Sequence, residues 1–382
     1  MGGPSAPLAA GRVCVVSQRL GGYDGVSVEA AKWQQAFGRL GWSVTRVAGY
    51  FADGHSASDI TLGGLWAPSY GGRAPAPDLS RISRLVEAHD MVVIDNAGSL
   101  PTCPEAALAL EAEAIRQGIP TIVRHHDPPW QLLTPLSATD DRFPLHDPRM
   151  LHVTINRLTE AEYRCRYPAL ARADAVTTMY NTVDFAALTG GRRARTRREM
   201  GVGDDAFLLV HPARNIARKN IPAALRVAGE LHRRTGRDVH YWLTDPTGAV
   251  GNPPAGVVVH RGHAGNPADM YAAADVITLP SLWEGWGLPV LEAAAALRPV
   301  VTMPYPILGE IHRLGIDTVD HHDVERLIGL LSDPHRYRAF TEANHRRGAA
   351  LDVGGLPAII ERAAARAARL SAANPLEPRR SA

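Results

Sequence analysis

The chain has 382 residues, of which 45% are hydrophobic, and its formal net charge at pH 7 is +2. This length predicts two or three domains, and this composition supplies ordinary globular cores, which excludes a mainly disordered protein. A nearly neutral chain has no broad basic field, so we expect no nucleic-acid partner. The three cysteines are far apart and form no C-x-x-C pair, which argues against a disulfide framework or a zinc site.

No segment approaches the roughly eighteen consecutive apolar residues of a membrane span. Residues 1–10 also lack a charged region followed by a long apolar core, as a secretion signal would have. We therefore expect a cytoplasmic protein, with loose peripheral attachment at the inner membrane surface left open. The basic run 192–198 is interpreted as a solvated helix face rather than a membrane-binding patch.

Short apolar runs alternate with helical patterns along the first half of the chain. Helices are expected at residues 26–40, 79–89, 104–117 and 158–166. Strands are expected at residues 13–17, 43–47, 91–95, 121–125, 151–155 and 175–178. This alternation predicts βαβ units and a parallel sheet.

The second half repeats the pattern, and the fold class predicted is α/β, with two doubly wound Rossmann-like parallel-sheet domains facing across a cleft. Its strands are expected at residues 207–211, 239–243, 257–260, 276–279 and 300–302. The predicted domains are residues 1–183 and residues 184–370, with the last helix able to pack back on the first domain, followed by a tail, 371–382. Residues 51–77 and 128–149 are long and rich in Pro and Gly, and are interpreted as acceptor-binding loops or surface insertions.

The most informative stretch is residues 281–293, which carries Glu284 and Glu292 between a buried strand and an Ala/Leu-rich helix. In open α/β sheets, ligands bind at the carboxyl ends of strands, and helix N-termini attract anions. Gly285 and Gly287 allow close approach to the backbone. Two carboxylates that accept hydrogen bonds from hydroxyls, with backbone amides between them for an anion, fit a nucleotide sugar.

A second feature follows the strand at residues 207–211, where Arg214 and Lys219 are five positions apart across a turn. Both cationic groups can point at one spot above the sheet. There they would stabilise the charge that builds on a departing diphosphate. A basic loop in solvent is the alternative, and the glutamate loop argues against it.

These motifs resemble those of family 4 retaining glycosyltransferases (glycosyl transferases group 1), which have the GT-B fold. The Glu-x7-Glu motif matches Glu284 and Glu292, and the Arg-x4-Lys motif matches Arg214 and Lys219. The other matching segments are the run 271–275, His125-His126-Asp127, and Gly21-Gly22 after the first strand.

The resemblance implies that the second domain binds a nucleotide diphosphate sugar and the first an acceptor. Glu284 would contact hydroxyls of the transferred sugar, Glu292 the ribose, and His126 the sugar from across the cleft, while His125 packs beside it. The implied catalytic residues are His126, Arg214, Lys219 and Glu284. The implied donor-binding residues are Gly21, Gly22, Arg214, Lys219, Glu284, Gly285, Trp286, Gly287, Leu288 and Glu292.

Two segments depart from the family pattern. His211-Pro212-Ala213 precedes Arg214 where many relatives have Val-Gly, and residues 303–306, Met-Pro-Tyr-Pro, replace a Gly-rich turn. We expect the first change to alter the phosphate pocket and the second to alter contacts around the transferred sugar.

The function implied is hexosyl transfer from a nucleotide diphosphate sugar to an acceptor hydroxyl with retention, the leaving diphosphate taking the acceptor proton. The chain has no Asp-x-Asp motif, so we expect no metal, and no cofactor beyond this co-substrate. The donor base (UDP, GDP, ADP or dTDP), the sugar and the acceptor (a sugar, small molecule or lipid-linked hydroxyl) stay open. The alternatives are a glycoside hydrolase that uses the two carboxylates, a nucleotide-sugar epimerase of similar architecture, and a non-catalytic nucleotide-sugar-binding protein.

Overall fold

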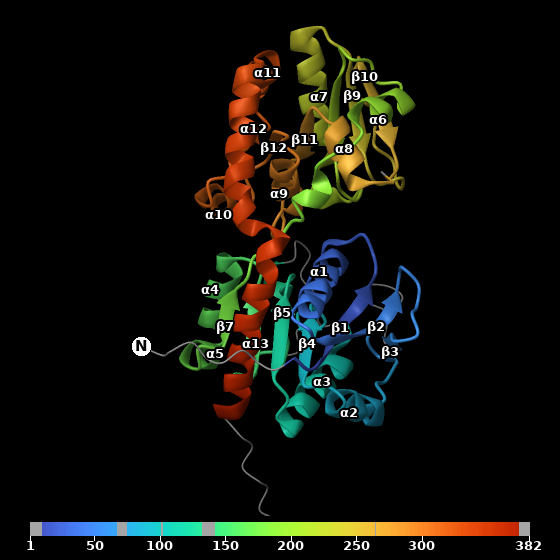
Figure 1. Cartoon of the computed structure of the whole chain (residues 1–382). Helices are drawn as coiled ribbons and strands as arrows, with labels where there is room; N and C mark the ends of the chain where they lie inside the picture. Colours follow the sequence, from blue (N-terminus) through green and yellow to red (C-terminus); the bar gives the residue numbers. More distant parts are fainter. Residues whose placement is uncertain (1–9, 67–74, 101, 132–141, 264, 374–382) are drawn as a thin grey trace, which may run out of the picture. The chain divides into compact units, whose positions relative to one another are not determined.

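The computed structural model describes residues 10–66, 75–100, 102–131, 142–263 and 265–373. The chain forms two compact units, one made of Met1–Asn181 with Gly354–Ala382 and the other of Thr182–Val353. The expected second domain ran to residue 370, whereas the chain returns to the first unit at Gly354. Figure 1 shows the final helix, α13 (Leu356–Ala373), lying along the first unit, where it contacts α1 and β5.

The first unit is a seven-stranded parallel sheet in the order β3-β2-β1-β4-β5-β6-β7. Its strands are β1 (Arg12–Leu20), β2 (Ser43–Phe51), β3 (Ile60–Thr61), β4 (Met91–Asp95), β5 (Thr121–His125), β6 (Leu151–Thr154) and β7 (Val176–Thr178). Its other helices are α1 (Gly25–Arg39), α2 (Leu79–Glu87), α3 (Pro104–Gln117), α4 (Arg157–Arg166) and α5 (Pro168–Arg172), with a 3-10 turn, η1 (Pro129–Gln131).

The second unit is a six-stranded parallel sheet in the order β10-β9-β8-β11-β12-β13. Its strands are β8 (Phe207–His211), β9 (Val239–Leu243), β10 (Val257–Arg261), β11 (Val276–Leu279), β12 (Val300–Thr302) and β13 (Val319–Asp320). Its helices are α6 (Arg193–Glu199), α7 (Ile221–Thr235), α8 (Pro267–Ala273), α9 (Leu288–Ala295), α10 (Leu308–Arg313), α11 (Val324–Ser332) and α12 (Pro334–Gly348).

The strand order reverses between β1 and β4 in the first sheet and between β8 and β11 in the second. Such switch points open a crevice at the carboxyl ends of the strands, where α/β proteins bind ligands. The segments singled out in the sequence follow β8 and β11. The predicted α/β architecture of two parallel sheets is confirmed.

The two long segments are only partly described. Residues 51–77 contain the two-residue strand β3, which is too short to produce a periodic pattern. Residues 67–74 and 132–141 lie outside the described residues, so the predicted acceptor loops stay predictions. So does the predicted tail beyond residue 373.

The prediction for the basic run 192–198 is wrong in one respect, because Arg197 on α6 is only 3% exposed. Its guanidinium donates hydrogen bonds to the carboxylate of Asp275 and to the carbonyls of Ala206 and Ala273. Arg193 donates to the same carboxylate. Part of the run therefore acts as a structural clamp, because Arg193 and Arg197 on α6 form hydrogen bonds with Asp275, the residue before β11.

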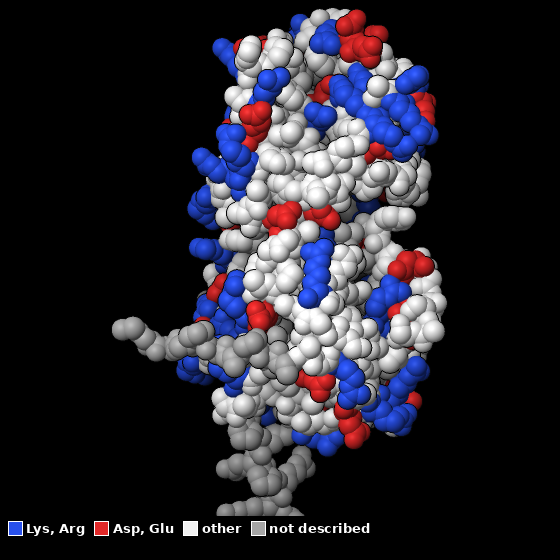
Figure 2. Space-filling view, in the orientation of Figure 1, with Lys and Arg blue, Asp and Glu red and all other residues white. Residues whose placement is uncertain are grey.

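Charged side chains of both signs are interspersed over the face of the molecule that Figure 2 draws. This distribution agrees with the formal net charge of +2.

Candidate functional site

Glu284 lies in the loop between β11 and α9, and it is held by two cations. Its Oε1 accepts a hydrogen bond from Lys219 Nζ at 2.5 Å, and its Oε2 from Arg218 Nη1 at 3.3 Å. The residue is only 6% exposed. Burial acts to raise the pKa of Glu284, but Lys219 and Arg218 outweigh it and the pKa is lowered. The carboxyl group is therefore ionised.

Lys219 is buried at the start of α7, where the 3-10 turn η3 (Ala217–Lys219) ends. The next residue, Asn220, has a φ of 52°, a left-handed conformation that Asn tolerates well. Burial lowers the pKa of Lys219, and the charges of Arg218 and Arg214 add to this, while Glu284 opposes them. The ion pair with Glu284 thus stabilises the charged form of Lys219 against its burial.

Arg214 and Lys219 are not equivalent in the structure. Arg214 is exposed, and within the described ranges its side chain makes no hydrogen bond or ion pair. Its charge is nevertheless near enough to lower the pKa of Lys219. Sequence reasoning missed Arg218, which also donates to the carbonyl of Trp283. The only sequence signal for Arg218 was its place beside Lys219.

Glu292 lies inside α9 and is oriented by α8. Its Oε2 accepts a hydrogen bond from the hydroxyl of Tyr271 at 2.5 Å, and the Tyr271 side chain is buried. Burial and the neighbouring Glu292 raise the pKa of Tyr271 well above its ordinary value, so the phenol keeps its proton. The two glutamates of the motif therefore have different hydrogen-bond partners: Glu284 contacts two cations, and Glu292 contacts the phenol of Tyr271.

Gly287 begins α9 with a φ of 98°, which favours glycine. A Cβ built at this position would lie 2.3 Å from the hydroxyl of Tyr305. Tyr305 itself is buried and donates to the carbonyl of Trp286. Tyr305 belongs to the segment 303–306 that departs from the family pattern, and this segment thus places a phenol ring against the loop between β11 and α9. Gly285 is half-buried, Trp286 is buried, and the half-buried Leu288 is the first residue of α9.

His211, the other departure, ends β8 and is fully buried. Its Nδ1 lies 2.7 Å from the hydroxyl of Tyr241, and its Nε2 has no hydrogen-bond partner within the described part of the chain. Burial, and then the charge of Lys219, lower the pKa of His211 to about 3. A neutral imidazole therefore lies beside the charged pair.

The buried His211 should make stability depend on pH. The unfolded chain binds a proton below about pH 6.5, whereas the folded protein does so only near pH 3. Stability is therefore lost as the pH falls from 6.5 toward 3. We expect the free energy of unfolding of His211→Gln to fall less steeply over this window than that of the wild type, as measured by urea unfolding at several pH values. Parallel pH curves for the two proteins would contradict this.

The first unit presents its own predicted residues at the carboxyl edge of its sheet. His126 follows β5, and its Nε2 lies 2.9 Å from Asp95 Oδ1 at the end of β4. Gly21 and Gly22 follow β1, and Gly21 has a φ of 74°, with no room for a Cβ beside Asp53. His125 is buried against His152, as a packing residue.

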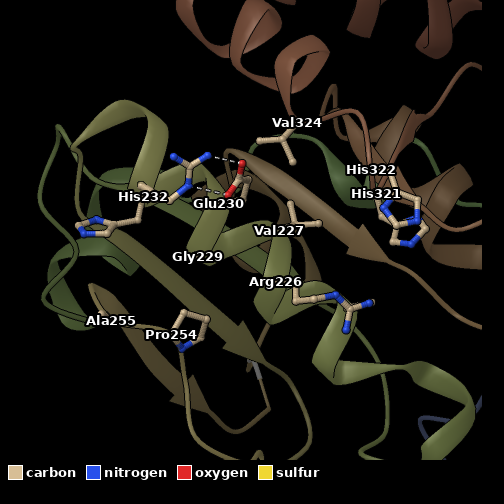
Figure 3. Close-up of a pocket in the computed structure, with 12 residues that line it drawn as sticks. Arg226, Val227, Gly229, Glu230, His232, Pro254, Ala255, His321, His322 and Val324 are labelled. Carbon is tan, nitrogen blue, oxygen red and sulfur yellow. Dashed lines mark hydrogen bonds and ion pairs between the residues drawn. The ribbon is translucent and has the colours of Figure 1, made fainter.

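A groove along α7 contains none of the predicted residues. Arg226, His321 and His322 line one end of it, and His232 with the turn at Pro254 lines the other (Figure 3). Within the ranges that the structure describes, no three His, Cys, Asp or Glu side chains are grouped to hold a metal ion. No helix among those residues is both long and apolar enough to cross a membrane.

Comparison with known proteins agrees with this geometry. A family model described as "Glycosyl transferases group 1" matches residues 204–343, which include Lys219 and Glu284. A mannosylglucosylglycerate synthase from Thermotoga maritima is 25% identical over 426 aligned positions, which cover 88% of this chain and 95% of the relative. The chain is a glycosyltransferase, and its residues 204–343 resemble the group 1 family. A D-inositol 3-phosphate glycosyltransferase from Saccharomonospora viridis is 30% identical to this glycosyltransferase over 40% of the chain and 41% of the relative.

Solved structures show the same fold for this glycosyltransferase. Anabaena Alr3699/HepE, solved in complex with UDP-glucose, superposes with a TM-score of 0.67 at 15% identity, covering 92% of this chain and 98% of that one. WaaG, a glycosyltransferase involved in lipopolysaccharide biosynthesis, gives a TM-score of 0.66 at 13% identity, covering 91% and 98%. The predicted GT-B class is confirmed.

Proposed function

We propose that this glycosyltransferase moves a hexosyl unit from a nucleotide diphosphate sugar to an acceptor hydroxyl, with retention at the anomeric carbon and without a metal ion. The observation that carries the proposal is the buried Lys219–Glu284 pair at the β8–β11 switch point. The UDP-glucose bound by Anabaena HepE supports a nucleotide-sugar donor. The hydroxyl-bearing acceptor is a sugar, a small molecule or a lipid-linked group.

The chemistry follows from the charges around the pair. An ionised Glu284 can only accept hydrogen bonds, which suits the hydroxyls of a sugar. Lys219 is a cation held by Glu284 in the loop before α9, and the exposed side chain of Arg214 can approach a second phosphate. Charge that builds on the departing diphosphate is stabilised there, and a leaving phosphate oxygen takes the acceptor proton.

The remaining predicted residues have supporting roles. The backbone amides of Gly285, Gly287 and Leu288, in the segment around Trp286, are proposed to face the phosphates. Glu292, held by Tyr271, is proposed to bind the ribose hydroxyls. Gly21, Gly22 and His126 of the first unit are proposed to contact the donor at the edge of their own sheet.

The same geometry argues against Glu284 as the acid of a glycoside hydrolase. A hydrolase needs one carboxylic acid that keeps its proton at working pH. The two cations lower the pKa of Glu284 against its burial, so this group has no proton to donate.

The test is a screen of UDP, GDP, ADP and dTDP sugars for slow hydrolysis and then for transfer to candidate acceptors. Arg214→Ala should lower the rate with the preferred donor, whereas Arg226→Ala, an exposed arginine in the α7 groove, should not. EDTA should leave the rate unchanged, and NMR of the product should show the anomeric configuration of the donor.

Other outcomes would overturn the proposal in identifiable ways. Conversion of a nucleotide sugar to its epimer without an acceptor would indicate an epimerase. Donor binding with neither transfer nor hydrolysis would indicate a non-catalytic binding protein. An inverted product or a requirement for a divalent metal would refute those parts of the mechanism.

The two glutamates should respond differently to substitution. We expect Glu292→Ala to raise the donor KM about tenfold with little change in kcat, because it removes hydrogen bonds that are equally strong in the ground and transition states. Glu284→Ala should mainly lower kcat, because it changes contacts at the reacting sugar. Steady-state kinetics on the two variants would contradict the assignment if the pattern were reversed.

A further inference from the structure

A buried group of charges lies at the ends of β4 and β5 in the first unit. Arg124 Nη1 donates to Asp95 Oδ2 at 2.7 Å, and Arg124 Nη2 lies 3.8 Å from Glu29 Oε2 on α1. All three side chains are at most 1% exposed. The guanidinium also lies 4.2 Å from the ring centroid of Trp33. Asp95 is therefore anchored on one oxygen by a cation that is itself packed on all sides.

The other oxygen of Asp95 holds His126, with Oδ1 2.9 Å from Nε2. Burial by itself raises the pKa of Asp95, but the charge of Arg124 and the contact with His126 outweigh it and the pKa is lowered. Asp95 is ionised in the folded protein, and an ionised carboxylate can only accept hydrogen bonds. The Nε2 atom of His126 must therefore carry the proton.

The backbone around His126 is held as well. Asn96 has a φ of 59°, and its Oδ1 accepts hydrogen bonds from the amides of His126 and Asp127. These contacts fix the turn after β5. The contact with Asp95 then decides which ring nitrogen of His126 carries the proton of the neutral imidazole.

The consequence concerns the second ring nitrogen. A neutral imidazole has one donor and one acceptor nitrogen. With Nε2 as the donor, Nδ1 is an acceptor, and it makes no hydrogen bond within the described residues. An acceptor at the carboxyl edge of a parallel sheet suits a hydroxyl group.

We propose that Asp95 is a positioning residue, which holds His126 in the Nε2-protonated form so that Nδ1 accepts a hydrogen bond from a hydroxyl of the bound sugar. The proposal rests on the proposed function for the identity of that ligand. The Asp95–His126 pair and the tautomer do not depend on the reaction.

The first measurement is made on the wild-type enzyme. Histidine is labelled with ¹⁵N, and two-bond ¹H–¹⁵N correlations at alkaline pH give the tautomer of each ring, with His126 assigned from the signals lost in His126→Gln. We expect the Nε2-protonated tautomer for His126. The Nδ1-protonated tautomer would overturn the proposal, and this result needs no variant of Asp95 to fold.

The second measurement uses Asp95→Asn, compared with Asp127→Asn as a control that removes the same charge from the residue next to His126. In Asp95→Asn the Nδ1-protonated form should appear, and kcat/KM for donor hydrolysis should fall about tenfold, as expected for one misplaced hydrogen bond. In Asp127→Asn the tautomer should stay that of the wild type. An unchanged tautomer and rate in a folded Asp95→Asn protein would refute the positioning role.

The two proposals fail separately. If the His126 tautomer is as expected but no nucleotide sugar is turned over, the proposed function is refuted, whereas the positioning of His126 by Asp95 is supported. If transfer is found but the tautomer is wrong, only the role of Asp95 fails.

Discussion

We expect Lys219→Ala to lower kcat by about 100- to 1000-fold, the range seen when a fixed group that stabilises transition-state charge is removed. Lys219 is the buried cation at the switch point, bonded to Glu284 at 2.5 Å. The loss should appear in kcat more than in KM for the donor, because charge builds on the diphosphate as it leaves. Wild-type turnover in a folded variant would refute the assignment.

The same substitution should also destabilise the protein, and this effect can be separated from the loss of activity. Removing one partner of a buried ion pair costs about 3–5 kcal/mol, whereas replacing both with neutral groups of similar size is often close to neutral. We therefore expect Lys219→Met combined with Glu284→Gln to recover most of the free energy of unfolding without recovering kcat. Recovery of both would mean that the pair is only structural.

The largest effect on stability alone is expected for Arg197→Ala. This substitution removes a buried guanidinium that bonds Asp275 Oδ2 at 2.9 Å and the carbonyl of Ala206 at 2.7 Å. Asp275 would keep the hydrogen bond from Arg193 but lose the one from Arg197, and the buried backbone carbonyls would lose a donor too, so the free energy of unfolding should fall by about 3 kcal/mol. Urea unfolding of the variant measures this directly.

Arg195→Ala is the matched control for this prediction, since it lies on the same helix and in the same basic run. Its guanidinium is mostly exposed and pairs with Glu199 one turn away, a kind of contact worth less than about 0.5 kcal/mol. Equal stability losses for the two variants would show that the run acts as a surface charge and not as a clamp. Donor kinetics should be near wild type for Arg195→Ala.

Several elements could be predicted with their observed limits. β4, β5, β8 and β9 are buried along their whole length, and such parallel strands appear in a sequence as short runs centred on apolar residues. The motif of Glu284 and Glu292 was also recognisable in the sequence, because its two residues are only eight positions apart. The short strands β3 and β13 were missed, since two residues carry no period.

The sequence by itself determined the α/β class, the two sheets and the motif that resembles that of group 1 glycosyltransferases, because apolar periodicity and short-range spacing are local properties of the chain. Only the tertiary structure decided which side chains meet. Arg218 joins Glu284 across 66 positions, His126 joins Asp95 across 31, and Arg197 joins Asp275 across 78. These contacts join segments that are far apart in the sequence, and they depend on how those segments pack together.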